Sequence, residues 1–243
     1  MSCVSDWDAR FRAGDHAGSE PDPFLLRAKE WLSLLPSGAT ALDLACGAGR
    51  HAVWLAGQGL QVTAVDASTE ALARTRRLAG LGGLSVSCRQ LDLESESVEL
   101  GGEAYDLVCG FYFLYRPLFP LLDRALRPGG LVIYKTYTVE RLRSPGGPRN
   151  PRHLLEPNEL LRLWSGFRVL VYEQIREGRA AAGIVARKTA LEPACHSSGS
   201  VPERGVASLA STASTTRLAM AMACAASAAL KNSAGMTSSS ALG

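Results

Sequence analysis

The chain has 243 residues, 47% hydrophobic and 20% charged, which fits one large globular α/β domain. Its formal net charge of +3 is too small to indicate a nucleic-acid-binding protein. The six cysteines form no C-x-x-C pair and no zinc spacing, and the first residues show no apolar leader. We therefore expect a cytoplasmic protein with reduced thiols, no metal and no membrane partner.

A helix is the first predicted element. Asp22 is suited to the N-cap and Pro23 to the first helical position. Apolar residues then recur on one helical face from Phe24 to Leu35. Pro36 ends the pattern, so the sequence predicts one helix between these prolines.

Strands and helices alternate after this helix. The sequence predicts five apolar strands at Ala39–Ala45, Gln61–Val65, Leu84–Arg89, Tyr105–Gly110 and Leu131–Thr136. It predicts helices between them at Arg50–Gln58, Thr69–Ala79 and Leu118–Leu126. Alternation of this kind indicates βαβ units and a parallel sheet, and nearly continuous apolar strands indicate that helices cover both faces.

The end of the domain departs from this alternation. A predicted helix at Pro157–Trp164 is followed by "FRVLVYEQI" and "AGIVARK", which the short polar "REGRA" joins into an antiparallel hairpin. The fold class is therefore α/β: a three-layer, Rossmann-like, seven-stranded sheet, mostly parallel with a C-terminal antiparallel hairpin. Ligands of such sheets bind beyond the carboxyl ends of the strands, beside the first strand.

Composition divides the chain into two parts. All Trp, Tyr and Phe residues lie before position 173. We expect residues 1–189 to form the folded domain and residues 190–243 to form a disordered, low-complexity tail, because Ser, Ala, Thr and Gly bury little apolar surface. The alternative for Leu218–Leu230 is a short helix, since the segment is rich in alanine.

A glycine turn lies between the first strand and the next helix. Gly47-Ala48-Gly49 lets the backbone approach a ligand closely, and Asp66 ends the following strand, 19 residues after Gly47. This local pattern fits either a dinucleotide or S-adenosylmethionine (SAM). Asp43, in the first strand, favours SAM, because a carboxylate there repels a pyrophosphate and tolerates an ammonium or sulfonium group.

Two further features favour SAM. Asp92 follows the third strand, where its carboxylate can accept the adenine amino group while the backbone N–H of Leu93 reaches a ring nitrogen. A Pro-Gly-Gly turn precedes the fifth strand, and the hairpin follows. The expected cofactor is therefore SAM.

The whole set resembles the class I SAM-dependent methyltransferases. "LDLACGAGR", "VTAVDAS", "LDL" and "YDLVCGFYFLY" are similar to four motifs of this class, in the same order, within residues 7–188. The segments "GRHAVWLA" and "NPRHLLEPNELL" also resemble the tellurite-resistance and thiopurine-type small-molecule methyltransferases.

The resemblance implies a set of cofactor-binding residues. Asp66 is expected to hold the ribose hydroxyls, and Cys109, at the end of the fourth strand, to lend its backbone carbonyl. Nothing nearby in the sequence activates the Cys109 thiol, so a nucleophilic role is disfavoured. The full set is Asp43, Ala45, Gly47, Gly49, Asp66, Ala67, Asp92, Leu93 and Cys109.

Substrate contacts are expected after the fourth strand, in "GFYFLYRPLFP", which should face the methyl group. Tyr112 and Tyr115 line a pocket there or fill the core, and Arg116 binds a substrate anion or forms a salt bridge. His153 is expected to be a base or a substrate contact. Residues Trp7–Phe11 are expected to form a lid over SAM.

The predicted function is methyl transfer to a small-molecule acceptor, such as a thiol, an oxyanion or a similar soft nucleophile. The transfer is an in-line displacement that depends mainly on positioning, and the sequence identifies no catalytic residue. A protein or RNA methyltransferase and a non-catalytic SAM-binding protein remain as alternatives, although the charge disfavours nucleic acid.

Overall fold

The structure is a computed structural model that describes residues 3–14, 18, 20–143, 147–176 and 179–190. The predicted tail, 190–243, lies outside the described residues except for Ala190. No helix in the described ranges is both long and apolar enough to cross a membrane.

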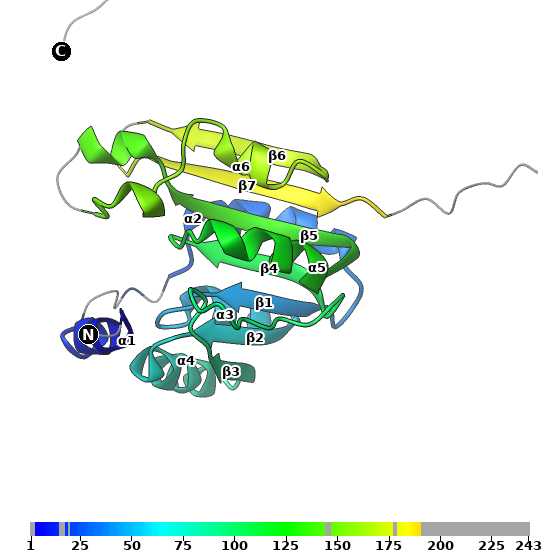
Figure 1. Ribbon diagram of the computed structural model, residues 1–243. Helices are drawn as coiled ribbons and strands as arrows, with labels where there is room; N and C mark the ends of the chain where they lie inside the picture. Colours follow the sequence, from blue (N-terminus) through cyan, green and yellow to red (C-terminus); the bar gives the residue numbers. More distant parts are fainter. Residues whose placement is uncertain (1–2, 15–17, 19, 144–146, 177–178, 191–243) are drawn as a thin grey trace, which may run out of the picture. The chain divides into compact units, whose positions relative to one another are not determined.

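A seven-stranded sheet forms the centre of the domain, with strand order β3-β2-β1-β4-β5-β7-β6 (Figure 1). Neighbouring strands among the first five pair in parallel, and β7 pairs antiparallel with both β5 and β6. The strands are β1 (Thr40–Leu44), β2 (Gln61–Asp66), β3 (Val86–Gln90), β4 (Tyr105–Phe111), β5 (Leu126–Tyr137), β6 (Phe167–Ile175) and β7 (Ala181–Lys188). The predicted fold class is confirmed.

One strand begins earlier than its apolar run indicates. Leu126 pairs with Tyr105, the pairing then shifts, and it resumes where Leu107 meets Leu131. Gly130 lies in the shifted stretch, where an added Cβ would come within 2.9 Å of the Asp106 carbonyl oxygen. The Pro-Gly-Gly segment therefore belongs to β5 and brings its backbone against β4, rather than forming a separate turn.

Helices cover both faces of the sheet (Figure 1). The buried side chains of α2 (Pro23–Arg27), α3 (Arg50–Gly57) and α4 (Thr69–Leu81) share one hydrophobic cluster. Those of α5 (Phe119–Ala125) and α6 (Glu159–Leu163) share the other cluster. The chain continues from α2 as the 3-10 helix η1 (Ala28–Leu34), so the single helix predicted there changes type at Ala28.

The remaining short elements are an N-terminal helix and three 3-10 helices on connecting segments. They are α1 (Cys3–Arg12) and the 3-10 helices η2 (Arg116–Leu118), η3 (Val139–Arg143) and η4 (Pro151–His153). Figure 1 shows that η3 and α1 both lie at the end of the sheet where the parallel strands finish. This carboxyl edge is where the sequence analysis expects the ligand.

Candidate active site

The turn after β1 has a backbone that few residues adopt. Ala45, Gly47 and Gly49 all have positive φ angles, of 49°, 55° and 82°. A Cβ on Gly49 would lie 2.5 Å from the Thr75 side chain of α4, so a larger residue does not fit there. Ala45 has no such freedom, and its left-handed conformation marks local strain at the carboxyl edge.

Asp66 fixes this turn to the end of β2. Its Oδ2 accepts from the Gly47 N–H at 2.9 Å and its Oδ1 from the Ser68 N–H at 2.9 Å. Burial raises the pKa of Asp66 above its ordinary value. Ser68 itself caps α4 by accepting from the Ala71 N–H. Asp66 is therefore not the helix cap, and each oxygen keeps a further lone pair for a ligand hydroxyl.

Asp43 is a buried carboxylate that faces the Ala52 N–H and the Cys109 thiol without forming a hydrogen bond of ordinary geometry to either. Its side chain lies within β1, is 1% exposed, and neither oxygen has a hydrogen-bond partner among the described residues. Burial, with a smaller effect from the Asp66 charge, raises its pKa from 3.8 to about 7. A buried unpaired acid of this kind is costly, so the site fits a ligand that brings a cationic or hydrogen-bonding group to the carboxyl edge.

The other predicted cofactor residues lie along the same edge. Cys109 of β4 is in register with Asp43. Burial raises the pKa of the Cys109 thiol well above its usual range, which opposes a nucleophilic role. Ala67 follows β2, and its carbonyl accepts from the Gln90 side chain at 3.1 Å. These contacts bring the ends of β1, β2, β3 and β4 together.

The segment after β3 also reaches this edge. The Leu91 N–H donates to the Asp66 carbonyl at 3.0 Å, which brings the following residues beside β2. Asp92 is exposed, and its Oδ1 accepts from the Glu94 N–H at 3.0 Å, while the Leu93 side chain is buried. The exposed Asp92 carboxylate and the Leu93 backbone thus lie on one short turn. Their contacts with adenine stay a prediction.

Helix α1 lies against the glycine turn. Phe11 is 4% exposed, and its ring comes within 3.5 Å of where a Cβ of Gly47 would be. Asp8 accepts from the Ser68 hydroxyl, and Arg74 of α4 donates to the Phe11 carbonyl. The sequence analysis expected a lid in this segment but did not predict a helix. The lid role itself stays a prediction.

The predicted substrate residues fall into two environments. Arg116 forms a bidentate pair with Glu159, at 2.6 and 2.9 Å, and also donates to the carbonyls of Arg152 and Leu154. Of the two alternatives for Arg116, the salt bridge is present. It ties the segment after β4 to the loop that carries the half-buried His153.

The aromatic residues after β4 are both partly buried. Tyr115 packs against the hydrophobic cluster on the α5 face. Tyr112 instead donates its hydroxyl to Asp22 on the opposite face, beside α2. The "GFYFLYRPLFP" segment therefore divides between the two faces of the sheet, and a substrate pocket formed by Tyr112, Tyr115, Arg116 and His153 together stays a prediction.

A buried polar cluster was not foreseen from the sequence. Lys135 of β5 and Asp22 are 8% and 5% exposed, and Lys135 Nζ lies 2.9 Å from Asp22 Oδ1. His51 stacks on Phe111 at 4.2 Å between ring centroids, and its Nε2 accepts from the Asp22 N–H. A lysine inside the apolar run "LVIYKT" was the available signal.

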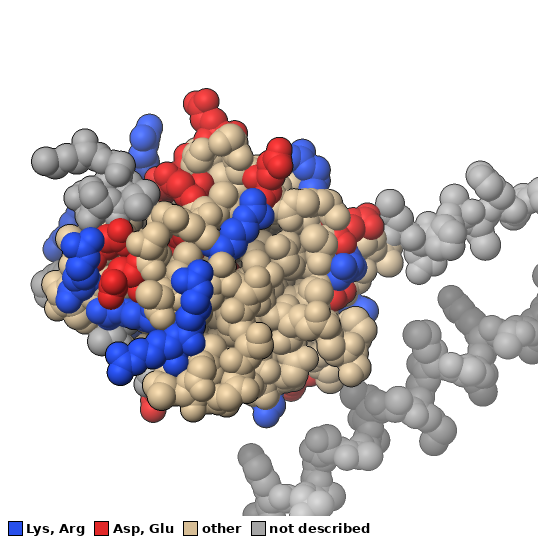
Figure 2. Space-filling view, turned by 90° about the horizontal axis from the view of Figure 1, so that it is seen from below, with Lys and Arg blue, Asp and Glu red and all other residues tan. Residues whose placement is uncertain are grey.

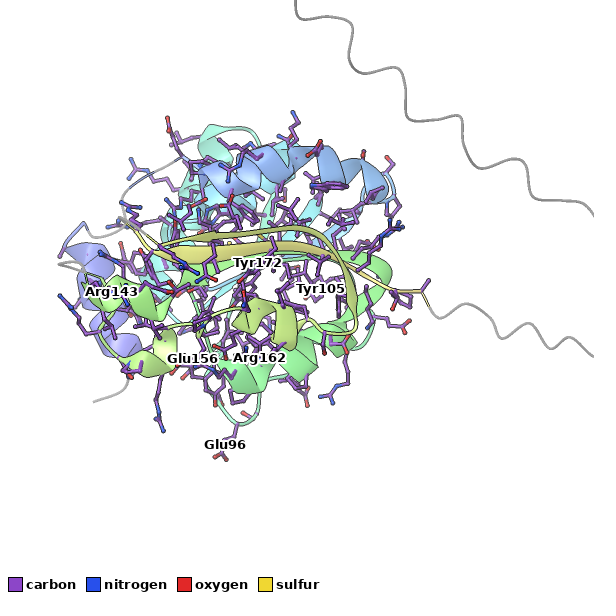
Figure 3. All side chains as sticks on the ribbon, turned by 90° about the horizontal axis from the view of Figure 1, so that it is seen from above. Glu96, Tyr105, Arg143, Glu156, Arg162 and Tyr172 are labelled. Atoms are coloured by element: carbon purple, nitrogen blue, oxygen red, sulfur yellow. The ribbon has the colours of Figure 1, made fainter. Side chains whose placement is uncertain are left out.

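A separate hollow lies at the opposite edge of the sheet. It has a volume of about 590 Å³ and is lined by residues that begin strands, including Thr40, Gln61 and Tyr105. Figure 3 shows Tyr105 well separated from Arg143, which belongs to η3 at the carboxyl edge. The hollow contains none of the predicted site residues, and Thr40 is already bonded to Asp106, so we place the site at the carboxyl edge.

Comparison with known proteins shows which proteins this chain is similar to. Residues 41–130 match the family described as a methyltransferase domain. The chain is also 32% identical over 118 residues to the "S-adenosyl-L-methionine-dependent Diels-Alderase iliD" of Neonectria sp. (strain DH2). That match covers 46% of this chain and 43% of the relative, so the chain spans less than half the length of this curated protein.

Three solved structures share the fold. A protein studied for the "conversion of a disulfide bond into a thioacetal group during echinomycin biosynthesis" has a TM-score of 0.60 at 20% identity, covering 79% of this chain and 95% of its own. TehB from Haemophilus influenzae gives 0.57 at 18%, covering 74% and 66%. The [4+2]-cyclase SpnF gives 0.55 at 20%, covering 69% and 80%.

The chain thus has the class I SAM-dependent methyltransferase fold. The family match and the SAM-dependent relative support SAM as its cofactor. Solved structures at these identities establish the fold alone, so evidence for the reaction has to come from the site itself.

Proposed function

We propose that the chain is a SAM-dependent methyltransferase that transfers a methyl group to a small-molecule acceptor. The observation that carries the proposal is the unpartnered Asp43 carboxylate, buried beside a glycine turn that Asp66 holds in place. A buried acid tolerates a sulfonium or ammonium group and opposes a pyrophosphate, so this arrangement favours SAM over NAD.

The residues of the carboxyl edge have separate roles in this proposal. Asp66 accepts from the ribose hydroxyls, Asp92 and the Leu93 N–H contact adenine, and Asp43 faces the methionine end. The Ala45–Gly49 turn and Ala67 let the backbone approach the ligand, and the Cys109 carbonyl faces its amino group. Bound SAM supplies an already activated methyl group, so the chain's main task is to position the acceptor and exclude water.

Charge near the edge supports an acceptor that is anionic or soft, such as a thiol or an oxyanion. Figure 2 shows Lys and Arg side chains gathered at the end of the molecule where α1 lies. Both Arg10 and Arg12 of α1 are exposed. Exposed cationic side chains at this end can pair with an anionic acceptor as it approaches the carboxyl edge. The resemblance of "GRHAVWLA" and "NPRHLLEPNELL" to the tellurite-resistance and thiopurine-type enzymes favours the same acceptor class.

A second candidate is a SAM-dependent cyclase. The specific observation is that a relative with 32% identity is described as a Diels-Alderase, and a [4+2]-cyclase shares the fold. Such an enzyme would bind SAM and transform a substrate without consuming the methyl group. The two candidates therefore differ in whether S-adenosylhomocysteine accumulates. Transfer to protein or RNA and a non-catalytic role are the further alternatives.

Two measurements test the proposal. Titration calorimetry should show binding of SAM and S-adenosylhomocysteine and no binding of NAD(H). Methyl-labelled SAM is then incubated with thiols, oxyanions and a small-molecule extract, and labelled products of low mass are expected. Tight NAD(H) binding without SAM binding would overturn the cofactor assignment. Label found only in protein or RNA would overturn the acceptor class.

A further inference from the structure

Asp22 is the hub of a buried network between α2 and the ends of β4 and β5. Its Oδ1 accepts from the Phe24 N–H at 2.8 Å and from Lys135 Nζ at 2.9 Å. Its Oδ2 accepts from the Tyr112 hydroxyl. Helix capping needs the first of these contacts alone, so the lysine and the tyrosine require another explanation.

Tyr112 connects this network to the cofactor turn. It directly follows β4, three residues after Cys109. The guanidinium of Arg50, the first residue of α3 after the glycine turn, lies 5.9 Å from the centre of the Tyr112 ring. Tyr112 also has a φ angle of +60°, rare for an aromatic residue. Strain of this kind is retained where the surrounding contacts fix a side chain.

The charges around Asp22 keep it ionised. Burial by itself would raise its pKa, but the hydrogen bonds from Tyr112 and Lys135 more than offset that effect, and the pKa lies below its ordinary value. His51 carries no positive charge at neutral pH, because burial lowers its pKa to about 3. Glu173 lies 4.0 Å from Lys135 Nζ and is paired with Arg27 at 2.6 Å.

Tyr112 stays protonated in this environment. Burial and the Asp22 charge raise its pKa above its ordinary value. Its hydroxyl proton points to Asp22, so the lone pairs of the hydroxyl oxygen remain as hydrogen-bond acceptors. Tyr112 is only partly buried, whereas Asp22 and Lys135 are buried, so Tyr112 is the one of these three that a substrate can meet.

We propose that Tyr112 and Asp22 form a proton relay that lets the site methylate neutral hydroxyl acceptors. This inference rests on the proposed function. The acceptor O–H donates to the Tyr112 oxygen, and the acceptor oxygen forms a bond to the methyl carbon. The carbon–sulfur bond breaks, and its electron pair stays on sulfur. The acceptor proton passes to Tyr112 while the Tyr112 proton passes to Asp22 Oδ2.

The step conserves charge, and its proton moves from a stronger acid to a weaker one. A positive sulfonium and a negative carboxylate become a neutral sulfide and a neutral carboxylic acid, while Lys135 keeps its charge. A low pKa does not prevent Asp22 from accepting the proton, because an oxygen that gains a methyl group while still protonated is a far stronger acid than a carboxylic acid. A thiolate has no proton to lose and does not need the relay. Lys135 is a positioning residue that holds Asp22 ionised.

The activity test compares the methylation rates of two acceptors in the wild type and in variants of two tyrosines. Phenol requires loss of a proton, whereas thiophenol is largely ionised at mildly alkaline pH. Tyr112→Phe should lower phenol methylation by about 10²- to 10⁴-fold, the usual contribution of a general base, and change thiophenol methylation by less than about threefold. Tyr137→Phe is the matched control, because it removes the hydroxyl of a neighbouring tyrosine whose ring centroid lies 4.9 Å from that of Tyr112. It should leave both rates unchanged.

The pH profile separates a relay from a structural role. With phenol, the wild-type rate should change little across the neutral range, because Asp22 is ionised throughout. In Tyr112→Phe the residual rate should rise about tenfold per pH unit, since only the phenolate reacts. Lys135→Met should raise the pKa of Asp22 and introduce a loss of rate on the acidic side. A purely structural network would lower all rates without changing these slopes.

A titration of the free protein gives a readout that does not depend on activity. Near-ultraviolet absorbance of phenolate, as the difference between wild type and Tyr112→Phe, reports Tyr112. In Asp22→Asn the phenolate should appear at lower pH, because the neighbouring charge is removed. An unchanged titration would contradict the hydrogen bond on which the relay depends.

The outcomes also distinguish the relay from the proposed function. If wild type methylates thiophenol alone, or if Tyr112→Phe methylates phenol as wild type does, the relay is wrong and methyl transfer stands. If wild type binds SAM but methylates neither acceptor, and labelled SAM gives no product of low mass with the other thiols, oxyanions and extract, the proposed transfer to small acceptors is contradicted and the relay falls with it.

Discussion

At the scale of single residues, the carboxyl edge holds two acids with different partners. Asp66 has both oxygens hydrogen-bonded to backbone N–H groups, whereas no described residue forms a hydrogen bond of ordinary geometry to Asp43. Their positions could be predicted from the sequence, because each ends or nearly ends an apolar strand. Their hydrogen-bond partners could not be predicted. The Asp22–Lys135 pair was also hidden, since it joins residues 113 positions apart.

Asp43 should make the stability of the free protein depend on pH. Its pKa rises from 3.8 to about 7 on folding, so the folded state favours the protonated form. Its contribution is complete below about pH 4 and is lost as pH rises toward 7, by at most about 1.4 kcal/mol per pH unit. Thermal melts without ligand should therefore show a falling Tm from pH 5 to pH 7. Asp43→Asn should flatten this slope, and an equal slope in the variant would contradict the assignment.

Asp66 should determine much of the cofactor affinity. Loss of charge-assisted hydrogen bonds costs about 1.5–3 kcal/mol, so Asp66→Ala should weaken SAM binding by roughly 10- to 100-fold. Calorimetry measures the affinity, and circular dichroism checks that the fold survives. Asp123→Ala is a suitable control, because that acid is half exposed and pairs with Lys188. Equal affinity in wild type and Asp66→Ala would remove Asp66 from the site.

At the scale of elements, the sheet was predicted well, because short continuous apolar runs alternate with stretches in which apolar residues recur at helical spacing. The departures have tertiary causes. Gly130 lets β5 approach β4 earlier than the apolar run indicates. Helix α1 has little apolar surface of its own apart from residues such as Phe11, and it is held by contacts with α4 that no local pattern shows.

Docking of α1 should depend on Phe11. A helix of 10 residues is marginal by itself, so its position relies on this buried ring and on polar contacts such as Arg74 to the Phe11 carbonyl. Phe11→Ala should speed hydrogen exchange in residues 3–14 and weaken SAM binding, while exchange in the central strands stays slow. Leu81→Ala, at a side chain 79% exposed, is the control. Unchanged exchange in α1 would show that Phe11 does not hold it.

At the scale of the whole molecule, we propose that the functional unit ends at Thr189 and that residues 190–243 are a dispensable tail. The last strand in the described part of the chain ends at Lys188, whose Nζ donates to the Leu126 carbonyl at 3.0 Å and closes the end of β7 against β5. Among the residues that the structure describes, the hydrophobic clusters on the two faces are both built from positions before 189. The active-site residues assigned above also precede that position.

A chain that stops at Thr189 should therefore fold and bind SAM like the full protein. A segment that adds no buried apolar surface should change the free energy of unfolding by less than about 0.5 kcal/mol when it is removed, as neutral surface changes do. Denaturant melts and SAM titrations of the two chains test this directly. In the full protein, amides beyond Ala190 should exchange hydrogen almost without protection. Unfolding on truncation, or strong protection centred on Leu218–Leu230, would instead make that segment part of the folded structure.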